Sequence, residues 1–324
     1  MQQFVIDTKI LSIHTEDRDI TKWPTPSHFE VELPVDYKNV VSLRLSEIHM
    51  PCSNYIFLNS YKNTSFKITY FADKEYTTTV FINEGTYTQL QLAEELEGQL
   101  HLLDTYFGLE NQFSLFAVVY SFTQMNFTFI HQNNAFSLDF TEEPSEVYNH
   151  YTYWGLGYYL GFCKDVYSST NGVFSSFTDT KVPTGTYFYL SAPHNASVHG
   201  EGYFYMELDG YNSMDEIAPF TERSSSLYNS SYSGKHNSAF AKIPLLASAN
   251  DKFYVGKKAF LSNVFVSDPP LERIKKLKFK FRQHDGRMIE FRNVNFTFTI
   301  EITLLRPDSI KPPILINSTN YKIR

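Results

Sequence analysis

Cysteines are scarce in this sequence. Its 324 residues contain two, Cys52 and Cys163, which lie far apart in the chain. A disulfide scaffold or a zinc knuckle needs several cysteines at short, regular spacings. We therefore expect neither, and the low cysteine count is typical of a chain made in a reducing compartment.

Long apolar runs are also missing. No uninterrupted stretch approaches the ~20 residues that a helix needs to cross a membrane. Asp7 and Lys9 interrupt the first apolar stretch, so the N-terminal residues do not have the pattern of a signal peptide. The sequence therefore predicts neither a membrane-spanning helix nor a secretory leader.

Charged residues make up 19% of the chain, and the formal net charge is −7. Binding to DNA phosphates requires clustered Lys and Arg, so this balance argues against a protein dedicated to DNA packaging. The sequence also lacks Gly-x-Ser-x-Gly, a Walker loop, His-Glu-x-x-His and Cys-x-x-Cys. We therefore expect no enzyme activity and no cofactor.

Aromatic residues are abundant, with 29 Phe and 23 Tyr, and they favour the half-buried faces of β-strands. Short segments that alternate apolar and polar residues recur along the chain, as in antiparallel sheets. The sequence predicts an all-β fold, an antiparallel, jelly-roll-like β-sandwich with one or two short helices. A double jelly roll is the alternative, because the strands could fill two. The expected strands are 4–13, 29–33, 40–50, 66–71, 77–82, 113–122, 127–131, 136–140, 186–190, 203–208, 240–243, 259–266, 277–282 and 294–305.

One helix has a clear start signal. Thr88 is a favourable N-cap residue, and Gln91 completes a capping box with it. Leu96 and Leu100 then follow on one face of the helix. We expect this helix to close one end or side of a sandwich. A second segment, a Gly-rich turn or short helix, is expected within 145–160.

The strands near the two ends of the chain look like halves of one sandwich, so we expect one elaborated domain over residues 1–306. A loop-rich insertion is expected at about 145–238, because 221–238 is rich in Ser, Asn and Gly and has no periodicity. Residues 307–324 contain three prolines and no alternation, which predicts an extended C-terminal arm.

One predicted strand has a basic face, which carries Lys276, Lys278, Lys280 and Arg282. This face could bind an acidic protein surface or the headgroups of a membrane. Alternatively, it is a solvated strand face whose lysines prevent pairing between sheet edges. The strand leads into an Asp-Gly pair at 285–286, which is typical of a tight hairpin turn, so the chain should return alongside it.

Other residues are candidates for contacts with a partner. Trp23 lies between charged residues and two prolines, so it could anchor an arm on a neighbour or cap its own sandwich. Lys311 and Tyr321 are candidate contacts in the C-terminal arm. Arg18 stands between two aspartates, and we expect an Arg–carboxylate pair to brace that turn.

A metal site is a weaker hypothesis. His194, His199 and Glu201 lie close together in the sequence, and imidazole and carboxylate groups bind transition metals. Their spacing does not place two imidazoles on one strand face, and the neighbouring Pro, Asn and Gly residues favour a loop. We therefore expect solvated loop residues and no metal.

Four blocks of sequence, in this order, carry a family resemblance. They are Arg18-Asp19, Pro24, Phe29, Leu33-Pro34 and Tyr37; then 85–88 with Leu92-Ala93; then Leu156-Gly157, 160–162, 203–208 and 240–245; and finally 271–286 with 296–302. Together they resemble the minor capsid proteins of nucleocytoplasmic large DNA viruses, and they extend over most of the chain.

The resemblance implies a virion structural protein with a jelly-roll-like β fold that cements major capsid capsomers into an icosahedral shell. It implies the major capsid protein and other minor capsid proteins as partners, and the inner membrane surface as a further one, with no specific nucleic acid. The expected location is the inner side of the shell, after synthesis in the host cytoplasm. The alternative is a carbohydrate- or receptor-binding module of the virion surface, because jelly rolls host lectins and exposed aromatic rings stack on sugars.

Overall fold

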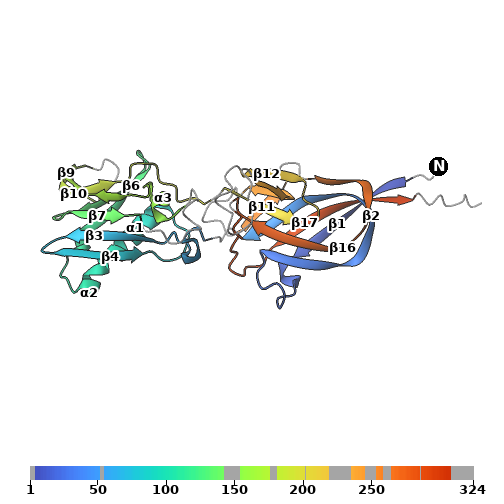
Figure 1. Ribbon diagram of the computed structural model, residues 1–324, viewed down its shortest axis with the longest axis horizontal. Helices are drawn as coiled ribbons and strands as arrows, with labels where there is room; N and C mark the ends of the chain where they lie inside the picture. Colours follow the sequence, from blue (N-terminus) through green and yellow to red (C-terminus); the bar gives the residue numbers. More distant parts are fainter. Residues whose placement is uncertain are drawn as a thin grey trace, which may run out of the picture.

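The computed structural model describes residues 4–51, 55–141, 154–175, 181–200, 202–218, 235–244, 253–257, 264–284 and 286–307. Most of its regular elements are β-strands, and every pairing between the described strands is antiparallel. The strands form two bodies that lie side by side along the long axis of the molecule (Figure 1). The predicted all-β, antiparallel class with short helices is confirmed.

We call the first body the curled body; it comprises the described residues of 4–51 and 202–307. Its main sheet has the order β1 (Phe4–His14), β17 (Thr297–Pro307), β2 (His28–Pro51), β16 (Val264–Arg282), β11 (Tyr203–Leu208) and β14 (Ala241–Pro244), and β15 (Phe253–Lys257) also pairs with β2. A separate hairpin consists of β12 (Met214–Ala218) and β13 (Lys235–Ala239), and the 3-10 turn η1 (Thr15–Asp17) follows β1. The main sheet curves around its own core (Figure 1).

The long strand β2 differs from the prediction. The sequence suggested two strands, 29–33 and 40–50, but the backbone stays extended between them and gives one strand of 24 residues. The pairing of β2 with β16 shifts register twice, and Asn39 has a φ of 54°. Such irregularities bend a strand. One continuous strand can therefore bend with the sheet, although the sequence pattern indicates two strands separated by a break.

The C-terminal hairpin prediction is wrong in part. A turn does follow Arg282, with the Gln283 N–H donating to the Arg287 carbonyl at 2.8 Å. The return, however, is a single bridge between Arg282 and Met288, and β17 pairs with β1 and β2 and not with β16. The reason is burial: Phe291 and Phe296 enter the core below Phe281, which takes the chain away from β16.

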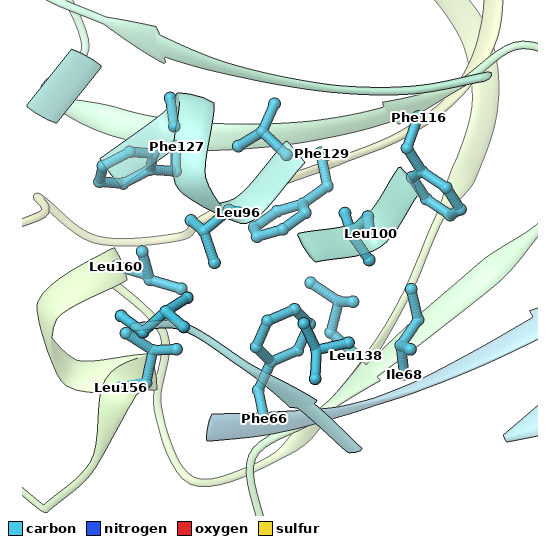
Figure 2. Packing of buried hydrophobic residues seen from close by; sticks show 14 of the residues in the cluster. Phe66, Ile68, Leu96, Leu100, Phe116, Phe127, Phe129, Leu138, Leu156 and Leu160 are labelled. Atoms are coloured by element: carbon cyan, nitrogen blue, oxygen red, sulfur yellow. The ribbon is translucent and has the colours of Figure 1, made fainter. Parts of the chain in front are cut away.

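We call the second body the sandwich body; it comprises the described residues of 55–199. One sheet has the order β4 (Glu75–Phe81), β3 (Ser65–Phe71), β7 (Phe136–Asp139), β8 (Val166–Ser168), and the other β5 (Phe116–Ser121), β6 (Asn126–His131), β10 (Gly185–Ser191), β9 (Thr170–Phe174). The short turns η2 (Asn59–Tyr61) and η3 (Phe113–Leu115) precede β3 and β5, and the helix α3 (Leu156–Leu160) lies between β7 and β8. Buried side chains from both sheets meet between them (Figure 2).

The predicted helix is α1 (Gln89–His101), followed by the short α2 (Leu103–Phe107). Its capping box is confirmed: the Gln91 N–H donates to Thr88 Oγ1 at 3.3 Å, and the Thr88 N–H donates to Gln91 Oε1 at 3.0 Å. Leu96 and Leu100 point between the two sheets of the sandwich (Figure 2). The helix therefore closes one side of the sandwich, as expected. No helix in the described ranges is both long and apolar enough to cross a membrane.

The two bodies have separate hydrophobic cores, because their buried apolar residues fall into two large clusters with no common member. The sandwich body is inserted in the chain between β2 and β11. The region expected to be a loop-rich insertion, 145–238, contains β8 to β12 among its described residues. That 1–306 acts as a single domain stays a prediction. The arm beyond Pro307 lies outside the described residues.

Candidate functional site

The basic face of β16 has the alternation that the sequence predicted, since Leu277, Phe279 and Phe281 are buried on the opposite side. Its first lysine is not free. Lys276 Nζ lies 3.0 Å from Glu30 Oε1 and 3.3 Å from Glu32 Oε1, both on β2. Hydrogen bonds to these two carboxylates raise the pKa of Lys276.

Trp23 and Lys278 contact each other on the same face. Lys278 Nζ lies 5.6 Å from the centre of the Trp23 ring, a cation–π arrangement. The ring also meets His28 edge-on, with 4.7 Å between centroids, and packs in part against the core of the curled body. The structure thus places Trp23 over its own sheet. Its proposed role as an anchor on a neighbour stays a prediction.

Arg18 braces the turn before Trp23, but not through a carboxylate as predicted. Its guanidinium donates to three backbone carbonyls, those of Thr15 at 2.7 Å, Trp23 at 3.0 Å and Pro24 at 3.1 Å. It also donates to Asn295 Oδ1 at 2.7 Å. Arg18 is nearly buried, and carbonyls within reach satisfy its N–H groups there. The turn is therefore tied to the residues that precede β17.

Arg282 is buried at the end of β16, with 2% of its side chain exposed. Its Nη2 lies 2.8 Å from Glu216 Oε2, and its Nε hydrogen-bonds Glu207. His284 hydrogen-bonds the other oxygen of Glu216, and the guanidinium lies 4.8 Å from the centre of the Tyr205 ring. This charged cluster joins β16 to β11 and to the β12–β13 hairpin.

The cluster changes the ionisation of its members. Burial alone would raise the pKa of Glu216, but the hydrogen bond from His284 and the charge of Arg282 outweigh it and lower that pKa. Burial and the nearby carboxylate of Glu216 raise the pKa of Tyr205. Glu216 therefore stays charged and paired. The sequence did not predict a role for Glu216, because nothing in the short β12 segment links this residue to Arg282, which lies 66 positions later.

The face of β16 is consequently balanced in charge. Three of its four cations stand beside four carboxylates: Lys276 beside Glu30 and Glu32, Lys280 beside Glu207 at 3.5 Å, and Arg282 between Glu207 and Glu216. Only the end of the strand, 279–282, lies between β2 and β11, and Lys276 and Lys278 precede the part that pairs with β11. Lys280 and Arg282 therefore do not guard a sheet edge, whereas that role for Lys276 and Lys278, like a docking role of this face, stays a prediction.

The candidate metal residues lie in the segment that leaves the sandwich body. His194 and His199 are exposed, and the His194 N–H donates to the Gly161 carbonyl at 3.0 Å. Glu201 is outside the described residues, as are Lys311 and Tyr321. Within the ranges that the structure describes, no three His, Cys, Asp or Glu side chains gather to hold a metal ion.

The sequence predicted the strand β1 but not its position at an exposed edge of the sheet. It pairs with β17 over its whole length, from Phe4 opposite Pro307 to His14 opposite Thr297, without a register shift. None of the other described strands pairs with its opposite side. Ile6 and Ile10 are 69% and 74% exposed. Apolar–polar alternation identified the strand, but its edge position depends on the order of strands in the sheet.

A polar cleft of about 640 Å³ lies where the sandwich body meets the loop before β17. The guanidinium of Arg292, from that loop, stacks 4.0 Å from the centre of the Tyr55 ring. Glu84 accepts a hydrogen bond from the Asn59 N–H at 2.9 Å, and Phe81 is 59% exposed. The cleft is lined by Tyr55, Asn59, Phe81, Ile82, Asn83, Glu84, Gln99 and Arg292.

Comparisons with known proteins give similarity in structure alone. No protein-family model matches the chain, and no curated protein matches it. The crystal structure of the mavirus penton protein is similar at 9% identity and a TM-score of 0.47, covering 93% of this chain and 99% of that one. The cryo-EM structure of the Sputnik virophage is similar at 12% identity and a TM-score of 0.41, covering 92% of this chain and 98% of that one. Because both TM-scores are below 0.5, neither similarity establishes a shared function.

Proposed function

We propose that this protein is a minor capsid protein of a large icosahedral DNA virus. In this role it holds major capsid capsomers in the shell through protein–protein contacts and carries out no chemical reaction. Its partners are the major capsid protein and other minor capsid proteins, on the inner side of the shell and near the inner membrane surface. It is made in the host cytoplasm and assembled into the virion.

The observation that carries the proposal is where the four resembling blocks lie in the fold. The first extends from the residue that caps the η1 turn into the first half of β2, and the second contains the start of the capping box of α1. The third contains α3, β11 and β14, and the fourth contains most of β16 and of β17. Arg18 of the first block also contacts Asn295, just before the final part of the fourth. The resemblance therefore involves the framework of both bodies and not isolated surface segments.

The fold suits a protein that works by contact. Each body is packed around its own core of aromatic and aliphatic side chains, which gives two stiff units in one chain. The curled body adds a long exposed strand edge, and main-chain pairing at such an edge provides adhesion between subunits. Binding of neighbours, in place of chemistry, is the role that this geometry supports best.

The proposal is tested by quantitative mass spectrometry of purified virions. A cementing protein should be present at a fixed ratio to the major capsid protein, and that ratio should persist through successive density gradients. It should also stay with the shell after the membrane is extracted with detergent. A chain that is absent from virions, or whose amount varies between preparations, would overturn the capsid role.

The polar cleft favours a second candidate, a carbohydrate-binding module. Sugar sites combine an aromatic ring with amide, carboxylate and guanidinium groups, and the cleft contains all of these. Glycan-array binding by the whole chain tests this function. Tyr55→Ala and Arg292→Ala should abolish any signal, while Tyr106→Ala, on α2 and 71% exposed, should leave it unchanged. An array without signal would exclude the module.

A further inference from the structure

The free side of β1 is unusual for an edge strand. Natural edges are commonly short, or carry proline, a bulge or lysines that discourage pairing. The edge at the other end of this sheet has such features, because β14 has four residues and ends in Pro244. By contrast, β1 has 11 residues, no proline and no bulge. It offers a long, regular set of main-chain groups to a further strand.

One face of β1 also offers apolar side chains. Ile6 and Ile10 are exposed there, in alternation with exposed Thr8 and Ser12. Cross-strand pairs on one face of a sheet stabilise the pairing, so a neighbour with β-branched side chains would fit this row. The lysine of this strand, Lys9, is on the opposite face, with its ammonium 3.5 Å from Asp7. It therefore does not interrupt the apolar row.

The C-terminal arm has the composition of such a neighbour. Residues 308–324 include the run Ile314-Leu315-Ile316, whose side chains favour strands. Within β1 the one carboxylate, Asp7, and the one ammonium, Lys9, balance to 1 − 1 = 0, and residues 314–318 carry no charge. The two segments therefore match in strand preference, and no like charges oppose their pairing.

The position of the arm favours exchange between copies. The chain leaves β17 at Pro307, directly beside Phe4 at the start of β1 (Figure 1). To reach the free side of its own β1, the arm would have to cross the start of that strand and then run parallel to it. Every described pairing is antiparallel, and the Pro312-Pro313 pair favours an extended course. A second copy can present its arm in the antiparallel direction.

We propose that residues 314–318 of a second copy of this chain add as an antiparallel strand to the free edge of β1. The inference rests on the proposed function, since it gives the contact through which neighbouring copies would hold together. Main-chain hydrogen bonds provide the adhesion, and the row of Ile6 and Ile10 sets the register.

A crosslinking experiment on full-length chains tests this contact. The native cysteines are replaced in Cys52→Ser and Cys163→Ser, and two differently tagged proteins then carry one thiol each, from Ile10→Cys and from Leu315→Cys. A short bismaleimide added to the mixture should join the two tagged chains. The matched control is Val173→Cys on β9, which is also an edge strand and is 69% exposed. Its yield with Leu315→Cys should be at least about tenfold lower.

An equilibrium measurement of self-association provides a second test of the contact. Sedimentation of full-length chains should show self-association that Ile10→Lys weakens at least about tenfold, a change of ~1.4 kcal/mol, and that Ile10→Val leaves intact. Equal yields at Ile10→Cys and Val173→Cys would overturn the inference. So would crosslinks that appear only when both thiols are in one chain. If the chain occurs in virions but this crosslink does not form, the contact between copies is contradicted and the capsid role is not. If the crosslink forms but the chain is absent from virions, the capsid role is contradicted and the contact between copies is not.

Discussion

Arg282 Nη2 lies 2.8 Å from Glu216 Oε2, with 2% and 4% of the two side chains exposed. The pair joins the end of β16 to the β12–β13 hairpin in a place that water barely reaches. Removing one partner of a buried ion pair leaves the other charge uncompensated, which costs more free energy than the intact pair contributes. The cluster is therefore a sensitive point in the stability of the curled body.

Glu216→Gln should lower the free energy of unfolding by up to about 3–5 kcal/mol, because the Arg282 guanidinium loses the more deeply buried of its two counter-charges and keeps only Glu207. Urea denaturation followed by tryptophan fluorescence measures the change. The control is Glu32→Gln, which removes an exposed partner of Lys276 and should cost about 0–1 kcal/mol. Equal effects of the two substitutions would contradict the account of the cluster.

The same carboxylate predicts a dependence on pH. The pKa of Glu216 is lowered from its ordinary 4.5 in the folded protein, so its contribution to stability is fully present above about pH 4.5. That contribution is lost as the pH falls through the lower, folded-state pKa. Wild-type protein should therefore lose more stability between about pH 5 and about pH 3 than Glu216→Gln does. Parallel losses in the two proteins would show that other groups cause the acid sensitivity.

Core packing gives a prediction for the sandwich body. Leu96 on α1 is completely buried between the sheets, and Leu96→Ala should lower the free energy of unfolding by about 2–5 kcal/mol through lost burial and a residual cavity. Leu90 lies on the same helix and is 50% exposed, so Leu90→Ala should change stability by less than about 0.5 kcal/mol. Thermal melts of both variants provide the comparison. A small loss for Leu96→Ala would place α1 outside the core.

Two glycines should respond in opposite directions. Gly161 ends α3 with a φ of 91°, and a Cβ there would collide with the His194 carbonyl, so Gly161→Ala should destabilise by more than about 1 kcal/mol. Gly98 lies inside α1 with open space around it, so Gly98→Ala should stabilise by roughly 0.5–1 kcal/mol. The two melting temperatures should move to opposite sides of the wild-type value. A shift in the same direction would contradict the backbone assignment at one of them.

Local features of the fold could be predicted from the sequence, and long-range ones could not. The strand at 127–131 and the capping box of Thr88 depend on neighbouring residues, and both are confirmed. The course of the chain after Arg282 depends on where Phe291 and Phe296 find space in the core, which no local pattern shows. The partner of Arg282 comes from a separate hairpin, so the sequence did not indicate that the last residue of the basic face lies in a buried cluster.

The position of β1 illustrates the same limit for the candidate site. Alternation of Ile6, Thr8 and Ile10 identifies a strand, but does not tell an edge from the middle of a sheet. That distinction depends on β17, nearly 300 residues later in the chain, and on what lies beyond β1. The surface that we propose as a contact between copies can therefore be recognised only once the order of strands in the sheet is known.

The measurement that tests the central claim most directly is crosslinking mass spectrometry on intact, purified virions. Lysines report the contacts: Lys276 and Lys278 on β16, and Lys311 and Lys322 in the arm. A capsid role predicts abundant links from these lysines to the major capsid protein, with those of the arm also reaching other copies of this chain. Virions that lack the chain, or in which it links to no shell protein, would contradict the account.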